Sequence, residues 1–338
     1  MAATLHDVAR LAGVSIKTVS NVINDYPHIR PATRERVEKA IGELGYTPNL
    51  TARNLRSGRT GAIALAVPDL ALSYFAELAA EVIAEAERAG VVVLVEQTGG
   101  DRDRELELLQ SPRLKLTDGL IFSALGMGQE DAARLGVPYP LVLLGERIFD
   151  AGVDHVTMRN VEAARAATEY LLASGRRRIA VVGAHQDEVI GSAGLRLRGY
   201  REALEAAGLS YDDALVAYTT LWHRANGATS TRELLARGVP FDAVFGLNDT
   251  LALGAMRALQ EASIAVPDDV AVIGFDDLDE AQYSIPSLTT VDPGQRWIAR
   301  TAVARLLQRI ADPDAAGQPQ LMLADFRIQV RESAPAAR

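Results

Sequence analysis

The stretch LHDVARLAGVSIKTVSNVIN, residues 5–24, carries two short helical patterns separated by a glycine. Thr4 stands where the N-cap of the first helix is expected, and apolar residues then recur at the spacing of one helix face. Gly13 makes the turn, and Ser15 is expected to cap a second helix over residues 16–23. The stretch therefore predicts a helix-turn-helix arrangement.

A third helix is expected over residues 32–44, directly after Pro31. With the second helix it supplies the apolar residues of a small core: Val19, Val22, Ile23, Val37, Ile41 and Leu44. We predict a helical domain over residues 1–46 on this basis. A helical hairpin that only caps a larger fold is the alternative.

The outer face of the second helix has the chemistry of a DNA-reading surface. Lys17 can donate to guanine O6 or N7, and Asn21 can pair with adenine N6 and N7. Ser20 adds a hydroxyl, and Ile16 offers an apolar group for a thymine methyl. Solvated residues on a surface helix would show the same composition.

Charge separates this region from the rest of the chain. The net charge is -9, yet residues 1–60 hold nine lysines and arginines against five acids, a net of +4 that leaves -13 for the remainder. A basic head attracts phosphates without regard to sequence, and an acidic body is repelled from them. The charge pattern thus favours a nucleic-acid partner for the first 60 residues.

The composition limits the remaining choices. A chain of 338 residues with 48% hydrophobic and 23% charged residues predicts a globular protein of two or three domains. The absence of cysteine excludes disulfides and thiolate metal sites, and no cofactor or metal is expected. The chain lacks an apolar run of membrane-spanning length and a secretory signal pattern, so a cytoplasmic location without membrane contact is expected.

From residue 61 onward, short apolar runs alternate with alanine-rich helical stretches. Continuously apolar strands indicate a parallel sheet covered on both faces. The strands are too numerous for one compact sheet, so the predicted body, residues 61–338, has two doubly wound α/β lobes. The first lobe is expected over about 61–160 and 290–322, and the second over about 161–289 and 323–338.

Residues 47–60 link the head to the body. Pro48 discourages helix across the preceding residue, and a brief helix is possible before Gly58. Such a helix is too short to be stable alone and is expected to form only when it is packed or bound.

The stretches DVARLAGVSIKTVSNVIN and ATRERVEKAIGELGYTPNLTARNLRSG resemble the DNA-binding headpiece and hinge of the LacI family. In the body, AVFGLNDTLALGAMRAL, VPDDVAVIGFDD and SIPSLTTVDP follow in the family's order and spacing. The resemblance implies a homodimeric transcriptional repressor with a periplasmic-binding-protein-like body, whose headpieces read successive major grooves of a near-palindromic operator. It also implies that hinge helices pair in the minor groove and insert Leu55 as a wedge. The DNA-binding residues expected from both arguments are Leu5, Ser15, Ile16, Lys17, Thr18, Ser20, Asn21, Asn24, Tyr46, Asn49, Ala52, Leu55 and Arg56.

A ligand cleft is expected between the lobes, outside the carboxyl ends of the strands. Arg196, Trp222, Asn248 and Asp276 follow predicted strands, and this mixture of charged, amide and aromatic groups suits a polyhydroxylated ligand. These positions resemble the family's effector contacts, as do Tyr74 and Phe75 in the first lobe. Structural roles are the alternatives: an ion pair for Arg196 and Asp276, a core position for Trp222, and a helix N-cap for Asp249.

Departures from the family pattern leave the effector open. Met158 and Arg159 precede Asn160 where an acid is common, and Gly145 and Glu146 stand where some members present an aspartate to a sugar. In the headpiece, Arg30 replaces a small capping residue before Pro31. We expect a carbohydrate effector, with a purine or nucleoside as the alternative.

Two other classes of protein fit the sequence less well. A sugar-binding transport protein would share the two-lobed body, but the basic head argues against it. An enzyme is not expected, because the sequence lacks the GxxxxGK[ST], GxSxG and HExxH motifs.

Overall fold

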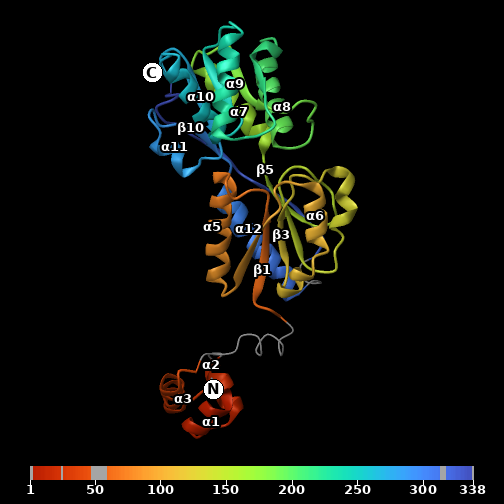
Figure 1. Cartoon of the computed structure of the whole chain (residues 1–338), viewed down its shortest axis with the longest axis vertical. Helices are drawn as coiled ribbons and strands as arrows, with labels where there is room; N and C mark the ends of the chain where they lie inside the picture. Colours follow the sequence, from red (N-terminus) through yellow and green to blue (C-terminus); the bar gives the residue numbers. More distant parts are fainter. Residues whose placement is uncertain (1–2, 24–25, 47–58, 313–316, 337–338) are drawn as a thin grey trace. The chain divides into compact units, whose positions relative to one another are not determined.

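The computed structural model describes residues 3–23, 26–46, 59–312 and 317–336 (Figure 1). Two compact units make up the chain, Met1–Thr60 and Gly61–Arg338. Some of the residues expected to contact DNA lie outside the described residues: Asn24, Asn49, Ala52, Leu55 and Arg56.

The N-terminal unit contains the three predicted helices, α1 (Leu5–Ala12), α2 (Ile16–Ile23) and α3 (Pro31–Leu44). Thr4 and Asp7 form a reciprocal capping box at the start of α1, and these hydrogen bonds lower the pKa of the Asp7 carboxyl. Gly13 ends α1 with a φ of 64°, and the Ser15 hydroxyl accepts a 3.1 Å hydrogen bond from the Thr18 amide. The helix-turn-helix prediction is therefore confirmed.

The headpiece core is built from one face of each helix: Val8, Ala9, Ala12, Val19, Val22, Val37 and Ala40 are buried. Tyr46 also belongs to this core and is only 8% exposed. It follows the left-handed cap residue Gly45, and its amide donates 3.0 Å to the Ile41 carbonyl, which turns its side chain back onto α3. Ile16 is half-buried against the same core, so it does not point wholly outward as expected.

The first lobe holds a six-stranded sheet in the order β11-β5-β4-β3-β1-β2, in which every pair is parallel. Helices α5 and α12 cover one face, and α6 with two 3-10 segments covers the other. The elements are β1 (Ala62–Val67), α5 (Ser73–Arg88), β2 (Val92–Gln97), α6 (Arg102–Leu109), η1 (Pro112–Leu116), β3 (Leu120–Ser123), η2 (Gln129–Leu135), β4 (Leu141–Leu144), β5 (Asp154–Met158), α12 (Gln295–Ala311) and β11 (Leu321–Ala324).

The second lobe repeats this plan with the order β12-β10-β9-β8-β6-β7, in which only β12 runs antiparallel among the described strands. Helices α7 and α8 pack on one face, and α9 and α10 on the other. The elements are α7 (Asn160–Ala173), β6 (Ile179–Ala184), α8 (Ser192–Ala206), η3 (Asp213–Leu215), β7 (Val216–Tyr218), α9 (Arg224–Ala236), β8 (Ala243–Gly246), α10 (Asp249–Glu261), β9 (Ala271–Phe275), α11 (Asp279–Tyr283), β10 (Thr289–Asp292) and β12 (Arg327–Gln329).

The chain crosses between the lobes three times, after β5, after β10 and after β11 (Figure 1). Because β10 stays in the second sheet to Asp292 and β11 stays in the first sheet to Ala324, the last two crossings lie slightly later than the boundaries at 290 and 323 drawn from the sequence. All three crossings join corresponding ends of the two sheets, which places the carboxyl ends of the parallel strands at the junction of the lobes.

Burial of the strands is not uniform. The strands β3, β4, β8 and β9 are buried throughout, as their continuous apolar runs indicate. In contrast, β2 is an edge strand, and Val92, Leu94 and Val95 are 58%, 41% and 36% exposed. The expectation that every apolar strand is covered is therefore wrong for β2.

Small residues let the helices of the second lobe approach closely. A Cβ on Gly199 of α8 would lie 2.2 Å from the Val161 carbonyl oxygen of α7, and a Cβ on Gly254 of α10 would lie 2.1 Å from the Arg224 carbonyl oxygen of α9. Only glycine fits at such contacts, so both helix pairs depend on it. Among the described residues, no helix combines the length and the apolar character needed to cross a membrane.

Candidate functional site

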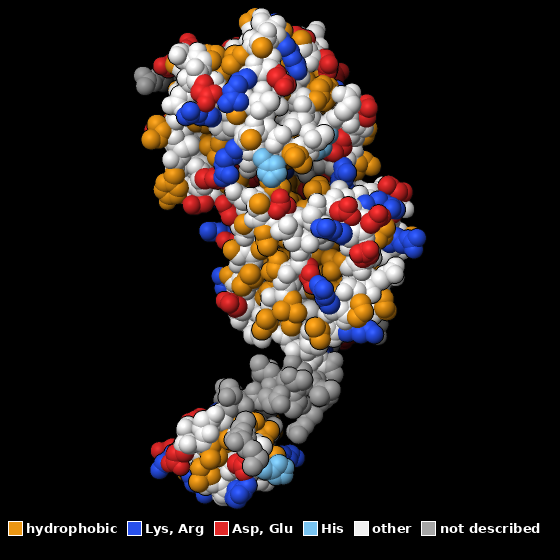
Figure 2. Space-filling model, in the orientation of Figure 1, with side chains coloured by type: hydrophobic (Ala, Val, Ile, Leu, Met, Phe, Trp, Pro, Cys, Tyr) orange, Lys and Arg blue, Asp and Glu red, His pale blue; other side chains and the backbone are white. Residues whose placement is uncertain are grey.

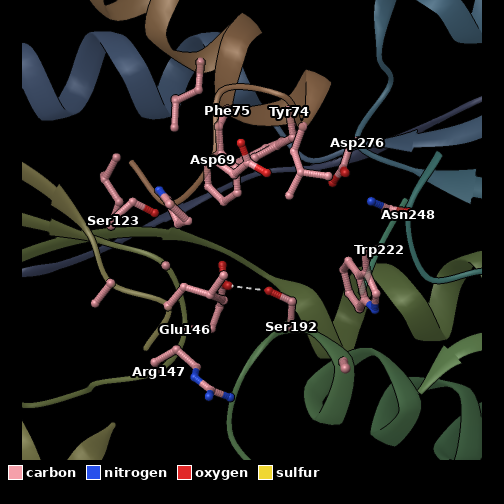
Figure 3. Close-up of a pocket in the computed structure, with 18 of the residues that line it drawn as sticks. Asp69, Tyr74, Phe75, Ser123, Glu146, Arg147, Ser192, Trp222, Asn248 and Asp276 are labelled. Carbon is pink, nitrogen blue, oxygen red and sulfur yellow. Dashed lines mark hydrogen bonds between the residues drawn. The ribbon is translucent and has the colours of Figure 1, made fainter. Parts of the chain in front are cut away.

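A cavity of about 220 Å³ lies between the two lobes, at the carboxyl ends of their strands. Its walls come from both lobes, and the predicted residues Tyr74, Phe75, Arg196, Trp222, Asn248 and Asp276 all line it. Figure 3 labels five of them, Tyr74, Phe75, Trp222, Asn248 and Asp276. The structure thus brings the six residues of the predicted effector set together in one pocket.

Arg196 is fixed in the floor of the pocket and is 2% exposed. Its Nε donates 2.8 Å to Asn160 Oδ1, and its Nη1 donates to the Leu247 carbonyl. The guanidinium lies over the Phe275 ring, 3.6 Å from the ring centroid, and 5.3 Å from that of Trp222. These contacts present a planar cation in one fixed orientation.

Asp276 faces Arg196, with 3.5 Å between Oδ1 and Nη2. Its backbone has a φ of 115°, a region that residues other than glycine rarely adopt. Burial raises the pKa of Asp276 to about 7, because the charge of Arg196 offsets only part of the desolvation and Glu146 and Glu77 repel a second negative charge. The carboxyl is therefore only weakly held by its partner and can bond to a third group.

Asn248 caps α10, and its Oδ1 accepts a 2.8 Å hydrogen bond from the Leu251 amide. The sequence suggested Asp249 as this cap, which is wrong. Asp249 is fully buried and accepts from the Leu278 amide at 2.8 Å and from the Thr290 hydroxyl, and burial raises its pKa well above the usual value. With its oxygen engaged by the helix, Asn248 keeps its amide nitrogen as the donor available on the pocket side (Figure 3).

Aromatic side chains form the apolar walls. Trp222 is half-buried, and its indole nitrogen donates 2.9 Å to the Gly183 carbonyl, which fixes the ring plane. Tyr74 and Phe75, at the start of α5, contact each other edge to face at 5.2 Å between centroids. Desolvation in the pocket raises the pKa of the Tyr74 phenol, and the carboxylates Glu146 and Asp276 raise it further, so Tyr74 keeps its proton as a donor.

The first lobe adds an acidic group to the wall. Glu146 follows β4, is 7% exposed and accepts a 2.9 Å hydrogen bond from the Thr157 hydroxyl. It also accepts a 2.6 Å bond from the hydroxyl of Ser192, the first residue of α8 in the second lobe (Figure 3). This bond spans the cleft, so the position of Glu146 depends on how the lobes meet.

A second bridge lies beside the first. Arg147 Nη1 donates 2.9 Å to Glu188 Oε2, and Nδ1 of His185 lies 2.8 Å from the same oxygen. Among the described residues, buried Arg147 Nε and His185 Nε2 have no hydrogen-bond partner, and both residues line the cavity. Arg147 Nε is therefore a donor for a bound molecule, and His185 Nε2 is a second polar atom on the same wall of the cavity.

Polar contacts join the lobes again through α5. The Ser73 hydroxyl donates 2.7 Å to Glu280, Arg224 pairs with the same carboxylate, and the Asp279 amide donates 3.1 Å to Glu77. Burial opposes the ionised form of Glu280, but the bonds from Arg224 and Ser73 together lower its pKa. Ionic contacts of this kind are modest in strength and can exchange during a change of lobe angle.

Several pocket residues were not predicted from the sequence. Glu146 was noted only as a departure from the family pattern, and Arg147, His185, Glu188 and Ser192 were not identified. Each of these residues follows a strand, β4 or β6, at its carboxyl end. Asn248 and Asp276 were predicted because ligands bind at the carboxyl ends of parallel strands, and the same rule applies to these strand ends. Their pairing across the cleft depends on tertiary structure and has no sequence signal.

In the headpiece, the predicted DNA-contacting residues of α2 are accessible. Lys17 is exposed, and Thr18, Ser20 and Asn21 are partly exposed, while Val19 and Val22 are buried on the opposite side. Ser15 is exposed and engaged in capping, and Leu5 is half-buried against the core. A face of polar side chains on a rigid short helix is what major-groove reading requires.

Comparison with known proteins agrees with this geometry. Residues 4–49 match the model of bacterial regulatory proteins of the lacI family, and residues 168–334 match the periplasmic binding protein-like domain. The transcriptional regulator CelR of Thermobifida fusca is 37% identical over 343 residues, which cover 98% of each chain. This chain belongs to the LacI family. It is accordingly a DNA-binding transcriptional regulator, and its fold is the LacI-like combination of a helix-turn-helix headpiece and a two-lobed body.

Other members of the LacI family are similar to this chain over most of its length. The repressor PurR of Vibrio atlanticus is 32% identical and covers 92% of this chain and 93% of its own. Among solved structures, a LacI-family regulator of Sanguibacter keddieii is 54% identical with a TM-score of 0.76, and covers 82% of this chain and 99% of its own. The protein in the CelR–cellobiose complex is 33% identical with a TM-score of 0.73, and the match covers 98% of this chain and 99% of that protein. The lac repressor, solved as a dimer bound to operator, is 29% identical with a TM-score of 0.84, and the match covers 99% of this chain and 100% of that chain.

Proposed function

We propose that this LacI-family protein is a repressor whose operator affinity is controlled by a sugar or sugar derivative bound between the lobes. The observation that carries the proposal is the composition of the pocket. It combines fixed donors and acceptors on Arg196, Asn248 and Asp276 with aromatic faces on Phe75 and Trp222. Hydrogen-bond donors and acceptors together bind the hydroxyls of a sugar, and an aromatic ring covers its C–H face.

A purine or nucleoside effector is the second candidate, and the aromatic walls favour it too, since Trp222 and Phe75 can stack on a base. The relatives include both a regulator solved with cellobiose and the repressor PurR. The acidic groups Glu146 and Asp276 support the sugar, because two buried carboxyls accept from several hydroxyls at once while a purine offers few donors.

For DNA, we propose that α2 reads base edges with Lys17, Ser20 and Asn21. Their exposure, with Val19 and Val22 anchoring the helix from behind, supports this assignment. The half-buried Ile16 leaves only part of its side chain for a thymine methyl, and the buried Tyr46 offers little surface for a DNA contact. The wedge role of Leu55 stays a prediction.

We further propose a homodimer on a near-palindromic operator. The exposed apolar edge strand β2 and the nearby Leu116, which is 63% exposed, would be covered by a second copy of the chain. Figure 2 shows hydrophobic side chains gathered over the surface of the first lobe. The operator-bound lac repressor, similar along nearly the whole chain, is a dimer.

Control of DNA binding would follow from a shift between lobe arrangements. The ligand can shift this equilibrium only by its difference in affinity for the two arrangements. The bridges Ser192–Glu146 and Arg147–Glu188 join the lobes beside the cavity, so a bound molecule that replaces or strengthens them supplies such a difference.

A thermal-shift screen of sugars, purines and nucleosides tests the effector class directly. A sugar should raise the melting temperature of the full chain, and the isosteric Asp276→Asn variant should lose most of that shift. A purine or nucleoside that stabilises the protein while every sugar fails would contradict the sugar proposal. A shift that Asp276→Asn leaves intact would contradict the assignment of the pocket.

A further inference from the structure

Exposed leucines stand at the outer edge of the ligand cavity on opposite lobes. Leu125 follows β3 in the first lobe and is 41% exposed, and Leu221 precedes α9 in the second lobe and is 55% exposed. Both line the cavity together with the polar groups described above. Figure 2 shows hydrophobic side chains at the junction of the two lobes, where the surface is hollowed.

The loop that carries Leu125 is held rigidly. The carboxylate of Glu105, 0% exposed, accepts hydrogen bonds from three successive amides, those of Leu125 at 2.9 Å, Gly126 at 3.0 Å and Met127 at 2.7 Å. A Cβ on Gly126 would lie 2.4 Å from the Arg102 amide nitrogen, so the loop also packs closely on the start of α6. A buried carboxylate thus fixes Leu125 in an exposed position.

Leu221 is held from both sides as well. The Thr219 amide donates 2.9 Å to the Ala184 carbonyl, and the Trp222 indole donates 2.9 Å to the Gly183 carbonyl. Leu221 lies between these two hydrogen-bonded residues, so its side chain has little freedom to fold back onto the lobe. Large apolar side chains on pinned loops keep their hydrophobic surface in water, which is unfavourable unless a ligand covers it.

We propose that Leu125 and Leu221 form an outer apolar subsite, and that the effector is a glycoside whose aglycone, an aryl group or the apolar face of a second sugar, binds there. This inference rests on the proposed function, in which the inner polar groups hold one sugar ring. A free monosaccharide would form hydrogen bonds with Arg196, Asn248 and Asp276 but would leave the side chains of both leucines exposed to water. A glycoside buries them at little entropic cost, because the loops are already in place.

Isothermal titration of the full chain tests this with matched ligands in the gluco, galacto, manno and xylo series: the free sugar, the methyl β-glycoside, the phenyl β-glycoside and the β-1,4 disaccharide. In the series that binds, the phenyl glycoside or the disaccharide should bind at least roughly ten-fold more tightly than the methyl glycoside. Whichever of these two ligands binds more tightly identifies the aglycone as an aryl group or a second sugar.

The variants Leu125→Ser and Leu221→Ser, singly and together, should remove this advantage and leave affinity for the methyl glycoside unchanged. Leu321→Ser is the matched control, since Leu321 is 52% exposed on β11 and does not line the cavity. The inference is overturned if the methyl and larger glycosides bind equally, or if the variants weaken all ligands alike. Failure of all sugars to bind would instead overturn the proposed sugar function, and the inference with it.

Discussion

The Arg196 guanidinium and the Asp276 carboxylate lie 3.5 Å apart, Nη2 to Oδ1, with both side chains almost fully buried. This separation is long for a charge-assisted hydrogen bond, and the other nitrogens of Arg196 are directed at Asn160 and Leu247. The pair is therefore loosely joined. A ligand hydroxyl can bond to both groups, and before it does so Asp276 remains partly protonated near neutral pH.

The raised pKa of Asp276, about 7 against the usual 3.8, makes stability depend on pH. Between these values the folded protein holds a proton that the unfolded chain has lost, so the free energy of unfolding falls as pH rises, by up to about 1.4 kcal/mol per pH unit from this group. Asp276→Asn cannot titrate and should show a shallower slope in urea unfolding between pH 4.5 and 7.5. Asp249, also buried with a raised pKa, supplies a residual slope of the same sign. An unaltered slope in Asp276→Asn would contradict the assigned environment.

Lys17 is expected to contribute sequence preference, not just charge. Lys17→Ala should weaken binding to the selected operator by about 1–3 kcal/mol, or roughly five- to 150-fold, and should relax the preference at one base pair. Lys39→Ala is the matched control, because Lys39 is an exposed lysine on α3 and pairs with Glu43. Fluorescence anisotropy with operator and scrambled duplexes measures both effects. Equal losses in the two variants would reduce the role of Lys17 to general phosphate attraction.

Gly254 should be irreplaceable in the packing of α9 on α10. The added methyl of Gly254→Ala would meet the Arg224 carbonyl oxygen, and the resulting displacement should destabilise the body by about 1–3 kcal/mol. Fluorescence of Trp222 and Trp297, both in the body, follows this unfolding. In contrast, nothing lies within 4 Å of a Cβ on Gly42 in α3, so Gly42→Ala should stabilise the headpiece by up to about 1 kcal/mol through helix propensity. A body unaffected by Gly254→Ala would refute the close approach.

The exposed edge strand β2 should determine the oligomeric state. Val92→Glu places a charge on a residue that is 58% exposed in the single chain, where it costs little, but it would be buried in a dimer. Sedimentation equilibrium should show a dimer for the wild type and a monomer for the variant. Leu321→Glu, on the opposite edge strand β11, should stay dimeric. A dimeric Val92→Glu protein would place the interface elsewhere.

Much of the fold could be predicted from the sequence because periodicity and capping are local properties. The helix over residues 16–23 lies where its pattern predicts it, and the helix expected over residues 32–44 begins one residue earlier, at Pro31. The apolar runs of the body alternate with helices as expected. Edge position is not a local property. The apolar run of β2 resembles that of a central strand, and only the sheet order shows that Val92 and Leu94 are exposed.

The sequence predicts which strand ends contribute residues to the candidate site, but it does not predict the contacts that those residues make. Asn248 and Asp249 are adjacent, and which one caps α10 depends on where β8 ends to within a single residue. The bridges from Ser192 to Glu146 and from Arg147 to Glu188 join residues 46 and 41 positions apart in sequence on different lobes. Their meeting follows from how the lobes close, and no spacing in the sequence encodes it.

The central claim is that a ligand held between the lobes controls the grip of the headpieces on DNA. Operator affinity of the full chain, measured by fluorescence anisotropy with and without the tightest-binding glycoside, tests it most directly, with Asp276→Asn as the variant that has lost the ligand site. The wild type should change its operator Kd at least roughly five-fold when the ligand saturates the cleft, and Asp276→Asn should not respond to the same ligand concentration. An operator Kd that stays constant while titration shows the cleft filled would contradict the account.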